Sequence, residues 1–192
     1  MNHLKKIAVF ASGSGTNAEN IIRHFSGSKT STVALILTNN PKAGVIERAK
    51  NAGTPYVVFS RTDFYESDAV IKILQHHQVD FIVLAGFLWL VPQKLILAFE
   101  NKIINIHPAL LPCFGGKGLY GTHVHRAVIA SRALLSGITI HYVNDKFDEG
   151  EIIFQAACHL SKDDTVETLA SKIHELEYRY FPTVIEKVVN HG

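Results

Sequence analysis

Cysteine is scarce in this chain of 192 residues. Cys113 and Cys158 lie far apart and have no CxxC spacing, which excludes a disulfide framework and is typical of a reducing compartment, so we expect a cytoplasmic protein. No apolar run approaches the roughly 20 residues that a membrane helix requires. The basic residues near the N-terminus precede an apolar run too short for a secretory signal, so no targeting segment is expected.

Excess charge and metal-binding motifs are also missing. The 19 basic and 17 acidic residues give a net charge of +2 and form no basic stripe, so we expect no nucleic-acid partner. The 11 histidines include His76–His77 and His123–His125, but neither an HExxH motif nor a Cys/His cluster accompanies them, so no metal site is expected. The hydrophobic fraction of 47% is sufficient for a core without a metal or a disulfide.

The first half of the chain alternates between buried-strand and amphipathic-helix patterns. The patterns predict strands at residues 5–11, 32–38, 56–60 and 80–85, and helices at residues 17–25, 43–51 and 63–77, the last capped by Asp63. This β-α alternation predicts an α/β fold, a Rossmann-like doubly wound and mostly parallel sheet.

The second half predicts a strand ending at His107, a helix at 124–130, and strands at 137–143 and 152–160 that form an antiparallel C-terminal part. A helix at 93–99 precedes them, and a long helix from 163 to about 189, interrupted at Pro182, follows them. No linker or repeat divides the chain. We therefore expect one domain, 1–192, with halves at about 1–100 and 101–192.

A glycine-rich loop, Ser12-Gly13-Ser14-Gly15-Thr16-Asn17, separates the first strand from the first helix. This arrangement points free backbone N–H groups and the helix dipole at an anion, usually a phosphate. Asn39 and Asn40 end the second strand where a dinucleotide enzyme carries an acidic residue, and the sequence around Lys117 is no Walker A loop. The loop therefore favours a mononucleotide or sugar phosphate, with a tight turn that binds nothing as the alternative.

Asn105 and His107 point to the same face of a strand because they are two residues apart. Pro108 follows and favours the end of the strand there. At the rim of an α/β sheet, a carboxamide and an imidazole can polarise a carbonyl and stabilise the oxyanion formed when it is attacked. Alternatively, the two side chains satisfy local hydrogen bonds only.

Two other segments have two interpretations each. Residues 86–92 are apolar and aromatic; they could line a pocket for a flat ligand, but the pattern favours the start of the 93–99 helix packing on the sheet. The carboxylate-rich turn at 144–151 is typical of a solvated hairpin loop. A carboxylate folded back onto His107 would instead raise the pKa of its imidazole and fix its tautomer.

Taken together, these stretches resemble the phosphoribosylglycinamide formyltransferase family, the glycinamide ribonucleotide (GAR) transformylases, over essentially the whole chain. The motifs that carry the resemblance are the loop at 12–17, Leu-Ala-Gly-Phe at 84–87, Asn-x-His-Pro-x-Leu-Leu-Pro at 105–112, Asp-Glu-Gly at 148–150, and Glu177 before Phe-Pro at 181–182. The resemblance implies the formyltransferase fold and transfer of a formyl group from 10-formyltetrahydrofolate to the glycyl amine of GAR in de novo purine (IMP) biosynthesis.

The resemblance also implies roles for particular residues. The glycyl amine would attack the formyl carbon directly, Asn105 and protonated His107 would stabilise the oxyanion, and Asp148 would support the imidazolium and help to move the proton. The GAR site would comprise Gly15, Thr16, Asn17, His174 and Glu177. The folate site would comprise Leu88, Trp89, Leu90, Val91, Asn105, Asn144, Asp145, Lys146, Phe147 and Asp148. No metal is implied, and we expect a monomer or weak homodimer with small-molecule substrates and no membrane partner.

The chain departs from the family at two places: Trp89 stands where members usually carry Arg, and the connection at 114–121 is longer than usual. Three other readings stay open. A 10-formyltetrahydrofolate hydrolase shares the trio but normally has an additional N-terminal domain, which we expect to be absent here. Another folate-dependent formyltransferase, such as a methionyl-tRNA formyltransferase, is similar around Asn105 and His107 but has an additional C-terminal domain, which we also expect to be absent. A non-catalytic nucleotide-binding module is disfavoured because Asn105, His107 and Asp148 are all present.

Overall fold

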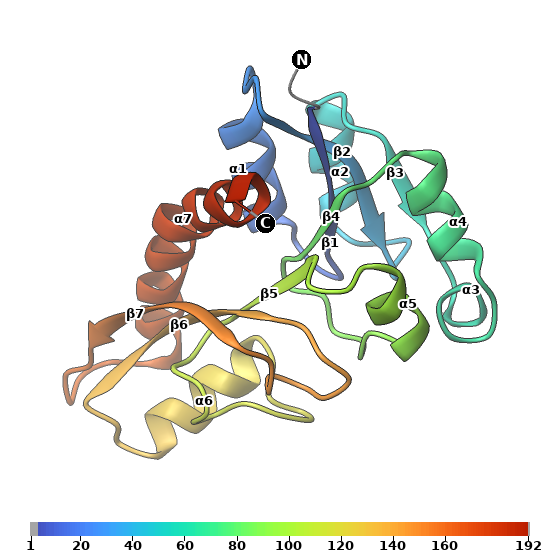
Figure 1. The fold of residues 1–192 in the computed structure, drawn as a ribbon. Coiled ribbons are helices and arrows are strands. Elements are labelled where there is room, and N and C mark those ends of the chain that lie inside the picture. The colour runs from blue at the N-terminus through green and yellow to red at the C-terminus, as the bar shows by residue number, and fades with distance from the viewer. Residues whose placement is uncertain (1–3, 192) are drawn as a thin grey trace.

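A single mixed sheet with helices on both faces organises the computed structural model, which describes residues 4–191 (Figure 1). Its strands are β1 (Lys5–Phe10), β2 (Ser31–Thr38), β3 (Tyr56–Val58), β4 (Phe81–Leu84), β5 (Ile103–His107), β6 (Leu135–Tyr142) and β7 (Ile152–His159). The helices are α1 (Thr16–Phe25), α2 (Val45–Asn51), α3 (Arg61–Tyr65), α4 (Ala69–His76), α5 (Gln93–Ala98), α6 (Thr122–Ala130) and α7 (Val166–His191). None of the helices within residues 4–191 is long and apolar enough to span a bilayer.

The strand order is β3-β2-β1-β4-β5-β6-β7. Strands β1 to β5 are parallel, whereas β6 runs antiparallel to β5 and β7 antiparallel to β6. The predicted doubly wound sheet with an antiparallel C-terminal part is therefore confirmed. The chain reverses its direction of winding between β1 and β4, and the crevice beyond the carboxyl ends of such strands is where open α/β sheets bind ligands.

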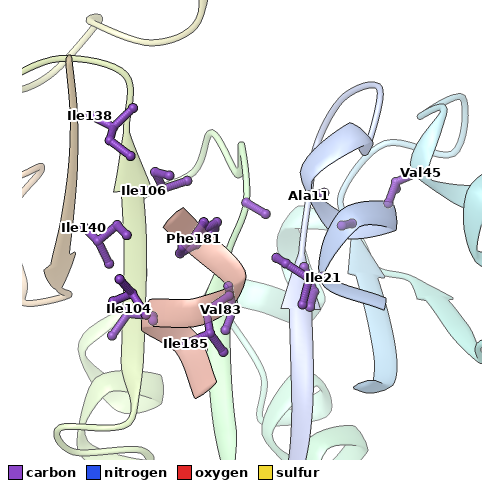
Figure 2. Close-up of a cluster of buried hydrophobic side chains, with 14 of the residues drawn as sticks. Ala11, Ile21, Val45, Val83, Ile104, Ile106, Ile138, Ile140, Phe181 and Ile185 are labelled. Atoms are coloured by element: carbon purple, nitrogen blue, oxygen red, sulfur yellow. The ribbon is translucent and has the colours of Figure 1, made fainter. Parts of the chain in front are cut away.

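Alternate side chains of each central strand belong to two separate cores. In β1, Ile7 and Val9 pack with α1, α2, α6 and α7, whereas Ala8 and Phe10 pack with α3, α4 and α5. Figure 2 shows the first of these cores, where α7 places Phe181 against the strands. Burial on both faces explains why the strands read as continuous apolar runs.

The predicted helix at 63–77 is wrong as a single element, because the chain forms α3 and α4 with a break between them. Ser67 accepts a hydrogen bond from the Ala69 N–H (3.2 Å) and donates one to the Asp63 carbonyl (3.3 Å), and such local side-chain bonds compete with a helix. Asp63 is not the cap either. Ser60 caps α3, and Asp63 closes the capping box by accepting from the Ser60 N–H (2.8 Å).

The predicted interruption at Pro182 is also wrong, since α7 runs from Val166 to His191 with the proline inside it. Phe181 and Ile185 on either side of Pro182 are fully buried in the core (Figure 2). Burial of these large side chains outweighs the backbone hydrogen bond that a proline removes. The helix therefore continues past Glu177 as one rigid element.

Candidate active site

A cavity of about 680 Å³ opens beyond the carboxyl ends of β1, β4 and β5. Its wall is built from the loops that follow β1 and β4, the end of β5, the segment before α6, the turn between β6 and β7, and one face of α7. The predicted phosphate loop, the Asn105–His107 pair and the Asp148 turn all reach this one cavity. Segments that lie more than 150 residues apart in the sequence, such as Asn17 and Glu177, hence share a wall.

The phosphate loop is held in place by α2, a contact that the sequence analysis missed. Arg48 donates from Nε to the Ser14 carbonyl (2.8 Å) and forms an ion pair with Glu19, while the Val45 N–H bonds the Gly13 carbonyl (3.2 Å). Gly15 is the N-cap of α1 and has φ +75°. The first backbone N–H groups of α1 thus open toward the cavity, where they can bind an anion.

Glu177 is the polar group that α7 contributes next to this loop, and only 6% of it is exposed. Its Oε2 accepts hydrogen bonds from Asn17 Nδ2 (2.9 Å) and His174 Nδ1 (3.0 Å). The hydrogen bond to Glu177 is the main reason why the pKa of the His174 imidazole is raised. A carboxylate and an imidazole therefore flank the anion site and can bind hydroxyl groups.

Asp148 lies at the centre of the other end of the cavity. Its Oδ2 accepts from the Gly116 N–H (3.0 Å) and lies 3.5 Å from His107 Nδ1; its Oδ1 lies 3.5 Å from Asn105 Nδ2 and 3.6 Å from His141 Nε2. Asp148 has φ +57°, a left-handed conformation that Asp tolerates better than most residues. The structure brings together the three residues that the sequence analysis placed in one trio.

The hydrogen bonds of His107 fix its tautomer. Its Nε2 lies 2.9 Å from the Phe114 carbonyl, which can only accept, so Nε2 carries the hydrogen. In the neutral ring Nδ1 is then a lone pair facing the Asp148 carboxylate. A proton added to Nδ1 would lie directly beside that negative charge.

Asp148 raises the pKa of the His107 imidazole, as expected for a carboxylate folded back onto it. Burial of His107, which is only 3% exposed, lowers the pKa more, so the net shift is downward. His141 lowers the pKa slightly further. Because the pKa falls below its ordinary value, His107 is neutral near pH 7 in the free protein, not protonated.

For Asp148, burial is the largest single influence and raises the pKa of the carboxyl. The neighbouring His141 imidazole, whose Nε2 lies 3.6 Å from Oδ1, the charge of His107 and the Gly116 N–H together outweigh it, so the pKa is lowered. Asp148 is therefore an ionised carboxylate in a nearly closed site. This negative charge faces the imidazoles of His107 and His141.

His141 is a site residue that the sequence analysis did not name. It pairs with Asn105 in the β5–β6 register, is 2% exposed, and donates from Nδ1 to the Tyr142 carbonyl (2.8 Å). Its Nε2 is consequently an acceptor, and Asn105 Nδ2 donates to it (3.1 Å). The signal available in the sequence was its position opposite Asn105 in a predicted strand, but that position depends on the register.

Both interpretations of residues 86–92 hold in part. Phe87 and Val91 are buried in the core beside α5, whereas Leu88, Trp89 and Leu90 reach the cavity wall. The Trp89 ring lies 5.8 Å from the Tyr65 ring, and Tyr65 donates from its hydroxyl to the Leu90 carbonyl (2.9 Å). Tyr65 thus packs against the Trp89 side chain and fixes the backbone of residues 86–92 through the Leu90 carbonyl.

The remaining predicted contacts divide into two groups. Lys146 and Phe147 line the cavity, but Asn144 and Asp145 are not part of its wall. The long connection at 114–121 supplies the Phe114 carbonyl and the Gly116 N–H to the trio. Within residues 4–191, no group of three or more His, Cys, Asp or Glu side chains could hold a metal ion, and the expected absence of a metal stays a prediction.

The model of the family described as formyl transferase matches residues 5–185 of the chain. The chain belongs to the formyl transferase family. The matched stretch contains every residue predicted for the site, from Gly15 to Glu177, whose individual roles stay predictions. All the residues that line the cavity thus lie within the stretch that the family model matches.

Among curated relatives of this formyl transferase, phosphoribosylglycinamide formyltransferase of Bacillus subtilis is 38% identical over 191 residues, which cover 97% of this chain and 95% of that protein. The chloroplastic phosphoribosylglycinamide formyltransferase of Arabidopsis thaliana is 43% identical over 187 residues, 94% of this chain. The chain spans 64% of the length of that relative and 60% of the cowpea (Vigna unguiculata) one. Phosphoribosylglycinamide formyltransferase from Bacillus halodurans has a solved structure with a TM-score of 0.86 and 40% identity, covering 96% of this chain and 95% of that one.

Gly15→Ala is expected to destabilise the protein by about 1–3 kcal/mol. An alanine would need the same positive φ, and its Cβ would lie 2.5 Å from the Val45 side chain. Urea denaturation followed by circular dichroism measures the change. Gly13→Ala is the matched control, because a Cβ there meets nothing within 4 Å; equal losses in both variants would contradict the clamp by α2.

The pKa of His107, measured from its ring protons by NMR, is expected to lie below the ordinary value of 6.5. Asp148→Asn should lower the pKa further, because it removes the carboxylate charge that raises it. Asp145→Asn, in the same turn but outside the cavity wall, should leave it unchanged. A wild-type pKa of 6.5 or higher would show that burial does not dominate at this imidazole.

Proposed function

We propose that this protein transfers the formyl group of 10-formyltetrahydrofolate to the glycyl amine of GAR, in purine biosynthesis. The observation that carries the proposal is the convergence of Asn105, His107 and Asp148 at one end of the cavity whose other end is the anion loop. Family membership and relatives named phosphoribosylglycinamide formyltransferase support the same reaction. Holding both substrates in one cavity supplies much of the rate through proximity.

The acceptor GAR lies with its phosphate on the backbone N–H groups of Gly15, Thr16 and Asn17. The dipole of α1 favours a dianion there. Glu177 and His174 then contact the ribose, since both flank the loop and Glu177 is already fixed by Asn17. The glycyl amine extends from the ribose toward His107.

His107 and Asp148 together hold the proton that the attacking amine releases. The Nδ1 lone pair of neutral His107 accepts it, and the carboxylate at 3.5 Å stabilises the imidazolium that forms. The same proton is then returned to the folate nitrogen as the tetrahedral intermediate collapses. A lowered pKa of His107 suits this role, because the ring must be neutral before it can accept a proton.

Asn105 donates a hydrogen bond to the oxyanion. Its Nδ2, which carries two N–H groups, lies 3.1 Å from His141 Nε2 and 3.5 Å from Asp148 Oδ1, the second distance being at the limit of a hydrogen bond. The weakly held N–H is free to turn to the carbonyl oxygen of the formyl group. His141 therefore acts by orienting the Asn105 amide.

The pterin of the donor lies against residues 88–91 and the turn that ends at Asp148. Main-chain groups of Leu88, Leu90 and Val91 bind it, because the Trp89 ring packs on Tyr65. Lys146 and Phe147 close the other side of the cavity. The side chains of Asn144 and Asp145 do not contact the pterin, and these residues serve only to lead the backbone to Lys146 and Phe147.

The proposal extends to the setting of the enzyme. The protein acts as one formyltransferase domain, with a phosphate-binding half at about 1–100 and a catalytic half at about 101–192. It works in the cytoplasm as a monomer or weak homodimer, with no metal and no nucleic-acid partner. The near balance of charges supports the absence of a nucleic-acid partner, and the lack of a metal-holding cluster among residues 4–191 supports a reaction without a metal.

The experiment that tests the function is an absorbance assay of folate release from 10-formyltetrahydrofolate by the purified protein. Release is expected only when GAR is present, with one formylated GAR formed for each folate released. Release at the same rate without GAR would indicate a hydrolase and overturn the proposal. Absence of release under both conditions would also overturn it.

Asp148→Asn is expected to lower kcat by about 10²–10⁴-fold, because an amide cannot stabilise the imidazolium of His107. The KM values for GAR and for the folate should change little, since the side chain acts mainly on the transition state. The same assay, run over a range of substrate concentrations, measures both constants. Asp145→Asn is the control for a lost carboxylate in this turn, and near-normal turnover in Asp148→Asn would remove Asp148 from the mechanism.

A further inference from the structure

Three histidines are buried among the described residues, and His125 differs from the other two. His107 bonds the Phe114 carbonyl, and His141 bonds both Tyr142 and Asn105. His125 is 5% exposed, yet its ring makes no hydrogen bond with any described residue, and its Nδ1 is fully buried. Because an unpaired polar group in the interior is costly, a buried imidazole without a partner indicates a ligand contact.

The position of His125 is fixed by the fold. It lies in the first turn of α6, next to the side of the helix that buries Val124 and Val128 in the core. Its ring forms part of the cavity wall. The packing of α6 on the core therefore fixes the backbone that carries His125.

His125 lines the cavity within electrostatic reach of both its ends. Glu177 and His174, at the sugar-phosphate end, and His107, at the catalytic end, all influence its pKa. Burial is the largest influence and lowers its pKa; Glu177 raises the pKa, whereas His174 and His107 lower it. The neutral ring offers one N–H donor and one lone-pair acceptor.

The part of GAR that bridges these two ends is the glycinamide linkage, an amide between the ribose and the reacting amine. An amide offers an N–H donor and a carbonyl acceptor, and either can bond His125 Nε2, the ring nitrogen left for a ligand because Nδ1 is enclosed by the protein. We propose that His125 binds this glycinamide linkage and thereby positions the amine in front of the formyl carbon. The inference rests on the proposed function and adds a specificity residue for the acceptor.

The test compares the wild-type protein with His125→Leu, in which an apolar side chain of similar size replaces the imidazole. The KM for GAR is expected to rise about five- to tenfold, as for the loss of one hydrogen bond. The KM for 10-formyltetrahydrofolate should stay within twofold. Inhibition by ribose 5-phosphate, which has the sugar and phosphate but no glycinamide, should be unchanged.

Two further variants sharpen the comparison. His125→Gln supplies another donor and acceptor and should recover most of the affinity for GAR. His76→Leu, an exposed histidine of α4, controls for the loss of an imidazole elsewhere. An unchanged KM for GAR in His125→Leu overturns the inference, as does an equal loss of affinity for ribose 5-phosphate.

A measurement on the wild-type protein decides the matter if these variants fail to fold. The ¹⁵N shifts of the His125 ring should change when GAR is added, and much less when ribose 5-phosphate is added. Equal responses to the two compounds overturn the inference. Failure of the proposed function itself has a different signature, because the wild-type protein would then show no GAR-dependent folate release.

Discussion

The negative charge of Asp148 is the constraint on which the catalytic end of the cavity depends. One carboxylate, 11% exposed, lies within 3.6 Å of polar atoms from β5, β6 and the loop at 114–121. Each of these elements supplies a different partner: His107 and Asn105, His141, and the Gly116 N–H. A buried charge requires such partners, and here the partners are the same groups that line the cavity.

Much of the site could be predicted because its signals are local. Each signal lies within a few residues of the sequence: the strand–glycine loop–helix unit, the two-residue spacing of Asn105 and His107, and the Asp148 turn. The partners that were missed come from pairings between elements distant in the sequence. Arg48 reaches the Ser14 carbonyl from another helix, and His141 meets Asn105 only through the β5–β6 register.

Burial of side chains explains two wrong predictions, the protonated state of His107 and the interruption of α7 at Pro182. The charge of Asp148 acts on His107 in the expected direction, but the depth of the ring, which outweighs it, is a property of the folded chain. Likewise, a proline usually ends a helix, but the fully buried side chains around Pro182 keep α7 intact. The break between α3 and α4 has the opposite origin, a local competition by Ser67 that periodicity alone does not reveal.

The loop at 114–121 supports the site through its main chain, by the Phe114 carbonyl and the Gly116 N–H. Every amino acid has a carbonyl, and all but proline have an N–H, so these contacts do not depend on which side chains the loop carries. Substitutions in this loop preserve the two contacts only where they preserve the backbone path, which Gly116 follows with φ +102° and which leaves no room for a Cβ on Gly115, 2.5 Å from the Leu111 side chain. A relative with other side chains at the remaining positions can retain the same electrostatic support, which no comparison of side chains would detect.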